Sequence, residues 1–135
     1  PARELARALI KEGKSKVGSI VFLGSVNAQT TIPNRSAYTA SKGAILSMTK
    51  GLALDFAPYG IRVNCVMPGP IWSSRYDANP EMAERKSAAL PLGRVATTDE
   101  IASCVYFFAT EASGNATGSS LVVDGGLTSI VNGAY

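Results

Sequence analysis

The sequence predicts a single α/β domain, residues 1–135, built on a parallel β-sheet. Its 135 residues suffice for one small domain with its own core but not for two. Short apolar runs alternate with helical patterns in the order strand, helix, strand, helix, strand, and helical crossovers between strands are typical of parallel sheets. The first run, Ser19–Leu23, is continuously apolar after its serine and β-branched at its centre, which favours a strand covered on both faces.

Two helices are predicted around this first strand. Residues 2–12 repeat apolar side chains at helical spacing with charged ones on the other side, which indicates a helix packed on one face. A polar loop over residues 13–18 separates it from the strand. Ser36 is the candidate N-cap of a long second helix that runs to about Phe56, and the following Pro58 and Gly60 would end it.

The second half of the chain continues the alternation. Residues 61–66 are the second predicted strand, which the Met67-Pro68-Gly69-Pro70 segment should stop because two prolines remove backbone donors. A long polar connection follows over residues 71–91, with a helical stretch around 80–89. Long connections of this kind in compact domains are often lids.

A capping box and a third strand complete the predicted domain. Thr97 followed by Glu100 fits a capping box that opens a helix. The apolar residues of that helix share one face: Ile101, Cys104, Val105 and Phe108. After a turn at residues 113–118, the third strand occupies residues 120–123 and is closed by Asp124-Gly125-Gly126.

Composition excludes several classes of protein. A content of 46% hydrophobic and 17% charged residues is globular, and the net charge of +3 does not indicate nucleic-acid binding. No apolar run is long enough to span a membrane and no secretory signal is visible, so we expect a cytoplasmic protein. The chain has no histidine, which excludes two-histidine zinc sites, and we predict no metal site. Cys65 and Cys104 lie in apolar segments and are predicted to be buried thiols.

Tyr38 and Lys42 are the first candidates for chemistry. A four-residue step along a helix brings two side chains onto the same face, one turn apart. A cation held beside the phenol favours the phenolate, which is useful where a tyrosine exchanges protons. The same spacing is common among solvated neighbours on helix surfaces, so the pair alone decides nothing.

Polar residues also gather where strands should end. Ser25 follows the first predicted strand, the segment from Pro68 to Ser73 follows the second, and Asp124-Gly125-Gly126 follows the third. Open α/β sheets bind ligands at the carboxyl ends of their strands. We therefore expect the site at this edge of the sheet.

Four features in this order resemble the carboxyl-terminal half of a classical short-chain dehydrogenase/reductase. They are Ser25, the Tyr-x-Ala-Ser-Lys frame at residues 38–42, Ile-Arg-Val-Asn-x-Val-x-Pro-Gly at 61–69, and Thr-Gly-x-x-Leu-x-Val-Asp-Gly-Gly at 117–126. The resemblance extends from Gly18 onward. It implies a Rossmann-type doubly wound parallel sheet, of which we expect only the second half, three strands with crossover helices, in this chain.

The resemblance also implies a reaction and three catalytic residues. The family moves a hydride between NAD or NADP and a carbonyl or secondary alcohol of a small molecule. Tyr38 would be the general acid or base, Lys42 would favour the ionised phenol and bind the nicotinamide ribose, and Ser25 would position the substrate oxygen. From the residues alone, Ser25 could also be a capping or loop serine.

The segment after the second strand resembles the family loop that holds the nicotinamide carboxamide. Its cofactor-binding residues would be Pro68, Gly69, Ile71 and Ser73, together with Tyr38 and Lys42; the family usually has threonine where Ser73 stands. Asn64 is expected to be structural. Three more side chains could line a substrate pocket under a lid, pack in the core or form an oligomer contact: Trp72, Tyr76 and Met82.

Some family features are missing from the sequence. No glycine-rich pyrophosphate turn is found, so we expect residues before Pro1 in a longer enzyme, and the choice of NAD or NADP and the substrate stay open. The family also leads us to expect a homo-oligomer in which the helices at 2–12 and Ser36–Phe56 pair across subunits. The alternative is a fragment or non-catalytic relative that acts as a binding or assembly scaffold, and a third possibility is epimerisation or dehydration on the same fold.

Overall fold

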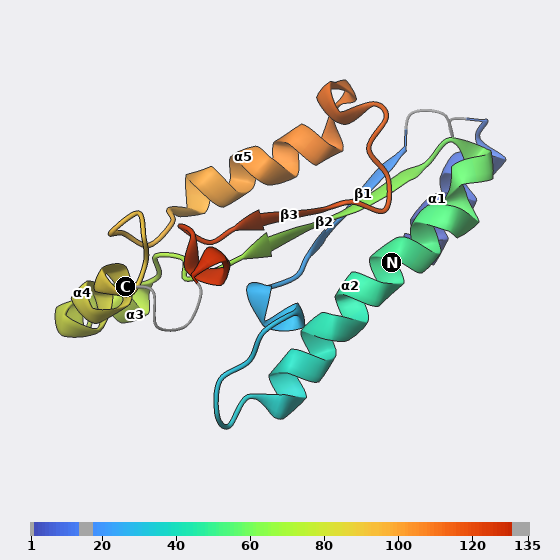
Figure 1. Ribbon diagram of the computed structural model, residues 1–135. Coiled ribbons are helices and arrows are strands. Elements are labelled where there is room, and N and C mark those ends of the chain that lie inside the picture. Colours follow the sequence, from blue (N-terminus) through green and yellow to red (C-terminus); the bar gives the residue numbers. More distant parts are fainter. Residues whose placement is uncertain (1, 14–17, 131–135) are drawn as a thin grey trace.

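The computed structural model, which describes residues 2–13 and 18–130, contains a three-stranded parallel sheet (Figure 1). Its strands are β1 (Ser19–Leu23), β2 (Arg62–Pro68) and β3 (Ser120–Val123), in the order β1-β2-β3. Both strand pairs are parallel. The predicted α/β class, the parallel sheet and the bounds of the first and third strands are confirmed. Most of the predicted polar loop, residues 14–17, lies outside the described residues.

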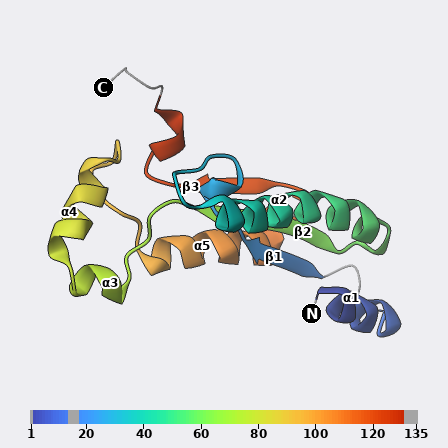
Figure 2. The same ribbon diagram turned by 90° about the horizontal axis from the view of Figure 1, so that it is seen from below.

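Helices cover both faces of this sheet. Figures 1 and 2 show α1 (Ala2–Lys11) and α2 (Ser36–Phe56) on one face and α5 (Thr98–Ala109) on the other. The short helices α3 (Ser74–Asp77) and α4 (Pro80–Ala88) lie at the end of the sheet opposite α1. Four single 3-10 turns complete the described chain: η2 (Val26–Ala28), η3 (Ala57–Tyr59), η4 (Glu111–Ser113) and η5 (Leu127–Ser129).

The central strand β2 supplies the core to both layers. Val63 packs toward α1 and α2, whereas Val66 packs toward α5, because successive side chains of a strand point to opposite faces. The first layer is formed by Ala6, Ile20, Ala53 and Ile61, and the second by Ile101 and Phe108 with half-buried Cys104, Val105 and Leu121. The predicted apolar face of α5 is therefore confirmed.

The prediction that strand β2 would stop before Pro68 is wrong, because the strand continues through Met67 and Pro68. Gly69 donates its N–H to the carbonyl of Val123 on β3, at 2.9 Å. Backbone groups alternate between the two neighbours of a parallel strand, so the missing N–H of Pro68 falls on the β1 side. On that side the pairing of β1 with β2 ends at Leu23, opposite Val66. The missing N–H of Pro68 therefore removes no hydrogen bond from the sheet.

The predicted N-cap of α2 is also wrong. The helix starts at Ser36 and its N-cap is Arg35, whose side chain makes no capping hydrogen bond. Asn34, at a left-handed φ of 64°, turns the chain immediately before it. The turn, rather than a capping hydroxyl, sets where this helix begins. Its end at Phe56 is as predicted, with Gly60 left-handed at φ 70° after η3.

The capping box of α5 is confirmed. The Thr97 hydroxyl accepts from the Glu100 N–H at 3.2 Å, and the Glu100 carboxylate accepts from the Thr97 N–H at 2.8 Å. Arg94 donates to both carboxylate oxygens of Glu100, at 2.6 and 2.9 Å. Hydrogen bonds from Arg94 and from the Thr97 backbone lower the pKa of Glu100 to about 2.

Polar groups inside the sheet are satisfied. Asn64 is fully buried, donates to the Ala116 carbonyl at 2.8 Å and accepts from the Ser119 N–H at 3.1 Å, so its predicted structural role is confirmed. Both cysteines are free; Cys65 is buried and Cys104 half-buried. Burial raises the pKa of the Cys65 thiol, which keeps it neutral near pH 7.

The long connection after β2 is folded around its own small core. The predicted helical stretch is α4, and α3 precedes it. Tyr76, Ala83, Leu90 and Val95 form a buried cluster between these segments. Among the described helices, none combines the length and the apolarity needed to cross a lipid bilayer.

Candidate active site

The predicted site lies at the carboxyl ends of the strands, where a pocket of about 460 Å³ opens. Ser25 follows β1, Gly69 follows β2, and Leu127 follows β3; all three line this pocket. Tyr38, from the first turn of α2, is a fourth lining residue. The fold therefore brings the predicted serine and tyrosine to one cavity.

Ser25 holds the turn that follows β1. It is 7% exposed and is the N-cap of η2, accepting the Asn27 N–H at 3.2 Å. The interpretation of Ser25 as a capping serine is therefore correct. The hydroxyl has a longer contact of 3.5 Å to the Asn27 side-chain oxygen. A hydroxyl donor can rotate away from such a weak partner, so capping does not prevent it from donating to a ligand.

Tyr38 and Lys42 lie on the same face of α2, as their spacing predicts. The Lys42 Nζ is 5.6 Å from the centroid of the Tyr38 ring, and it donates to the Leu23 carbonyl at 3.2 Å. This bond ties the ammonium to the end of β1. The Tyr38 side chain itself remains 40% exposed and accessible from the pocket.

Arg35 also lines this pocket, and the sequence did not indicate it. Its guanidinium carbon lies 5.8 Å from the centroid of the Tyr38 ring, and its side chain lines the same pocket. Two cationic side chains therefore lie within cation–π distance of one phenol ring, at 5.6 and 5.8 Å from its centroid. Arg35 precedes α2 as its N-cap, so the spacing rule for helix faces does not apply to it and no short pattern marks it.

The loop after β2 is held by backbone contacts. A methyl group on Gly69 would lie 2.9 Å from the Asp124 Cα, so only glycine allows β2 and β3 to end so close together. Ile71 forms a parallel bridge with Ala96, in which the Trp72 N–H and the Pro70 carbonyl bond to Ala96. In such a bridge the N–H and C=O of Ile71 itself point away from Ala96.

The remaining predicted residues occupy different places. Lys42, Pro68, Ile71 and Ser73 do not line the pocket. Pro68 is buried at the end of β2, and the Ser73 hydroxyl is 3.5 Å from the Arg75 Nε. Tyr76 and Met82 do line the pocket, with Tyr76 only 5% exposed. Trp72 instead borders a separate cavity of about 350 Å³ and donates to Asp77 at 3.0 Å.

Asp124 fixes the third side of the pocket. Its carboxylate accepts from the Gly126 N–H at 2.9 Å, and from the N–H and hydroxyl of Thr128 at 2.8 and 2.7 Å. Burial of this carboxyl raises its pKa, but the hydrogen bonds outweigh that effect and the pKa is lowered overall. The turn that presents Leu127 is therefore held by a charged acceptor.

Comparison with known proteins assigns the family. A family model described as enoyl-(acyl carrier protein) reductase matches residues 2–128. The chain belongs to the short-chain dehydrogenase/reductase family. Among its curated relatives is the short-chain dehydrogenase virB of Hypocrea virens, 45% identical over 115 residues, which are 82% of this chain and 46% of that protein.

Solved structures of dehydrogenases share the fold. A gluconate 5-dehydrogenase of Burkholderia cenocepacia, in complex with NADP and tartrate, superposes with a TM-score of 0.85 at 34% identity, covering 96% of this chain and 51% of that one. A 4-hydroxyisoleucine dehydrogenase complexed with NADH gives a TM-score of 0.87 at 31% identity, with coverages of 96% and 54%. The chain thus spans about half the length of the dehydrogenases it matches.

Proposed function

We propose that the protein with this chain is an oxidoreductase that moves a hydride between NAD or NADP and a carbonyl or secondary alcohol. The observation that carries the proposal is that Ser25 and Tyr38 line one pocket while the Lys42 ammonium is held 5.6 Å from the phenol ring. Family membership and dehydrogenase relatives with bound NADP or NADH support it.

Tyr38 and Ser25 would both bind the substrate oxygen, each in a different role. The Tyr38 hydroxyl would donate a proton to the carbonyl oxygen in reduction and accept one from the alcohol in oxidation. The Ser25 hydroxyl, released from its 3.5 Å contact with Asn27, would donate to the same oxygen and hold it near the phenol. Lys42 would stabilise the phenolate formed when the proton leaves.

The donor set on this chain suits the nicotinamide end of a cofactor. A carboxamide needs both a hydrogen-bond donor and an acceptor. The backbone of Ile71 offers both, because its N–H and C=O point away from Ala96. The Ser73 hydroxyl can also donate or accept. Pro68 and Gly69 would shape the approach, and the Lys42 ammonium with the Tyr38 hydroxyl would bind ribose hydroxyls. When bound, the nicotinamide supplies or accepts the hydride.

Replacing Tyr38 with phenylalanine tests the proposal. Since the side chain is 40% exposed, removal of its hydroxyl should leave the fold intact. We expect nicotinamide-dependent turnover by the full-length protein to fall by about 10² to 10⁴. The matched control is Tyr59→Phe, on η3 and outside the pocket, which should keep full turnover. Unchanged turnover in Tyr38→Phe would refute the assigned role.

The alternative function, a binding or assembly scaffold, has one observation in its favour. The sequence contains no glycine-rich turn for a pyrophosphate. Titration of NADH and NADPH into the isolated chain, followed by fluorescence, separates the two functions. Saturable binding favours the enzyme, and its absence favours the scaffold for these residues.

Homo-oligomerisation and a cytoplasmic location stay predictions. Exposed apolar side chains on α2, Met48 at 44% and Leu54 at 76%, support pairing of this helix across subunits.

A further inference from the structure

We infer that the substrate carries an anionic group, a carboxylate, sulfonate or phosphate, in addition to its carbonyl or alcohol. This inference rests on the proposed function and narrows its substrate class. Its basis is the charge around the pocket that holds Ser25 and Tyr38. Among the residues that the structure describes, no acidic side chain lines that pocket, whereas four basic residues do: Arg35, Arg75, Arg85 and Lys86.

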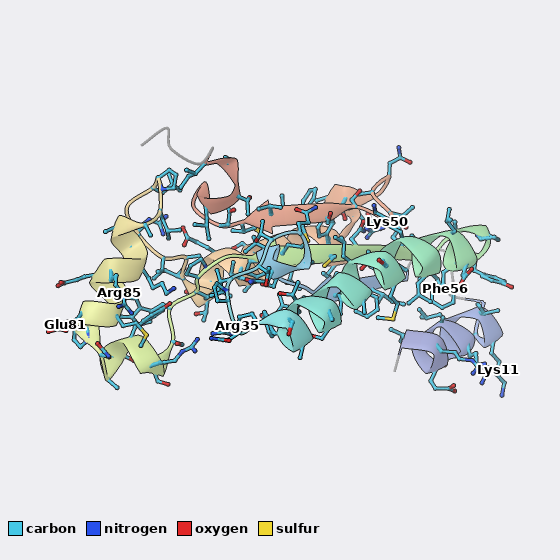
Figure 3. All side chains as sticks on the ribbon, turned by 60° about the horizontal axis from the view of Figure 1, so that its bottom comes forward. Lys11, Arg35, Lys50, Phe56, Glu81 and Arg85 are labelled. Atoms are coloured by element: carbon cyan, nitrogen blue, oxygen red, sulfur yellow. The ribbon has the colours of Figure 1, made fainter. Side chains whose placement is uncertain are left out.

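The four cations reach the pocket from three segments, one immediately before α2 and two in the consecutive helices α3 and α4. Arg35 immediately precedes α2, Arg75 belongs to α3, and Arg85 with Lys86 to α4. Figure 3 shows Arg35 at the amino-terminal end of α2 and Arg85 on α4. A single solvated helix face would not produce this arrangement, because the tertiary fold gathers the charges at one cavity.

None of these four side chains forms an ion pair with another residue in the described ranges. The Arg35 guanidinium carbon lies 5.8 Å from the centroid of the Tyr38 ring, and Arg75 has only a 3.5 Å contact with the Ser73 hydroxyl. The α4 carboxylates, Glu81 and Glu84, do not line the pocket; Glu81, one turn before Arg85, shares with it a small neighbouring depression of about 170 Å³. The positive charge is therefore available to a ligand.

Grouped cations without anions repel one another, and a bound anion relieves that repulsion. Arginine side chains match carboxylate, sulfonate and phosphate groups because their N–H donors form a planar fork. Since Ser25 and Tyr38 line the same cavity, a molecule with its carbonyl at these hydroxyls can extend its anionic end toward α3 and α4. The apolar lining from Tyr76, Met82 and Leu127 would contact the carbon chain between the two ends.

Matched substrate pairs test the inference in the full-length protein. Acetoacetate and levulinate are compared with their methyl esters, which keep the carbonyl and lose the charge. We expect kcat/KM for the acids to exceed that for the esters by about tenfold or more. The double variant Arg85→Gln, Lys86→Gln should abolish this preference by lowering turnover of the acids alone. Added salt should weaken the preference in the wild type.

The control variant Lys11→Gln, Lys50→Gln removes the same charge from α1 and α2, toward the other end of the molecule (Figure 3), and should keep the preference. Equal turnover of acids and esters, or an intact preference in the Arg85 and Lys86 variant, would overturn the inference. So would a rise in the KM for NADH or NADPH alone, since the cations would then serve the cofactor phosphates.

Failure of the proposed function gives a different result. If no acid or ester is turned over, calorimetric titration of levulinate into the wild type and the Arg85 and Lys86 variant decides the anion site separately. Binding that the variant loses supports an anion site without the proposed reaction. No binding to the wild type overturns the inference as well.

Discussion

The two ends of the parallel sheet use polar side chains in opposite ways. At the amino-terminal end, Arg62 donates to the carbonyls of Phe108 and Thr110 and to the Ser113 hydroxyl, at distances from 2.7 to 3.0 Å. The Ser19 hydroxyl donates to the same Phe108 carbonyl at 2.7 Å. Each of these donors forms its hydrogen bonds within the chain, to a carbonyl or a hydroxyl of another residue.

At the carboxyl-terminal end the side chains keep unused capacity. The Ser25 hydroxyl donates only through one long contact of 3.5 Å, Tyr38 is 40% exposed, and the arginines around the pocket have no carboxylate partner among the described residues. Both ends are rich in polar groups, so polarity alone does not locate a site. What distinguishes the carboxyl end is hydrogen-bonding capacity that the described chain does not itself use.

Arg62→Met should have the largest effect on stability. The methionine keeps much of the apolar stem but leaves two carbonyls near the end of α5 without their charged donor. We expect the free energy of unfolding to fall by about 2 to 4 kcal/mol, measured by urea denaturation. Turnover per folded molecule should not change, because the residue lies far from the pocket.

Arg62→Lys is the matched control for that change. Lysine cannot reproduce the forked geometry, but it keeps a charged donor. Arg62→Lys should therefore lose less stability than Arg62→Met. If Arg62→Met unfolds at the wild-type urea concentration, then the amino-terminal end is not held in the way that the hydrogen bonds indicate.

Gly69→Ala tests the carboxyl end, where backbone rather than side chains fixes the geometry. The added methyl would lie 2.8 Å from the Asp124 Cβ and 2.9 Å from its Cα, and the backbone there cannot easily move aside. We expect a loss of about 1 to 3 kcal/mol in urea unfolding together with lower turnover, since the loop to Ser73 would shift.

Gly51→Ala offers a control for the glycine change. Gly51 lies within α2 and a methyl group there meets no atom within 4 Å. This variant should be neutral or more stable by up to about 1 kcal/mol. Equal stabilities of the two alanine variants would argue against the close approach of β2 and β3.

The fold could be predicted from the sequence wherever local signals agreed. The bounds of β1, the end of α2 and the capping box of α5 all follow from short patterns that carry their own physical cause. The start of α2 could not, because it depends on the left-handed Asn34 and not on a capping serine. The extension of β2 through Pro68 depends on where β1 ends, which is a tertiary fact.

The same distinction holds for the candidate site. Ser25, Tyr38 and Lys42 could be proposed because each belongs to a short motif or a one-turn spacing. The basic side chains around the pocket could not, because Arg75 and Arg85 lie on different helices and no local pattern relates them to Arg35. Only the folded chain brings their charges to the pocket that Ser25 and Tyr38 line.

Glu100→Gln should have the smallest effect and sharpens the contrast between paired and available arginines. Arg94 forms an ion pair with Glu100. In the folded chain the pKa of the Glu100 carboxyl is about 2, below its usual 4.5. A lowered carboxyl pKa contributes stability that is fully present above pH 4.5 and is lost as the pH falls toward 2. Glutamine can still accept from the Thr97 N–H, so the capping box survives while the charge and its titration disappear. Urea unfolding of the variant should therefore show a shallower pH dependence between pH 2 and 4.5, with little change in stability at pH 7 because the pair is exposed. An unchanged slope would mean that Arg94 is as free as the arginines around the pocket.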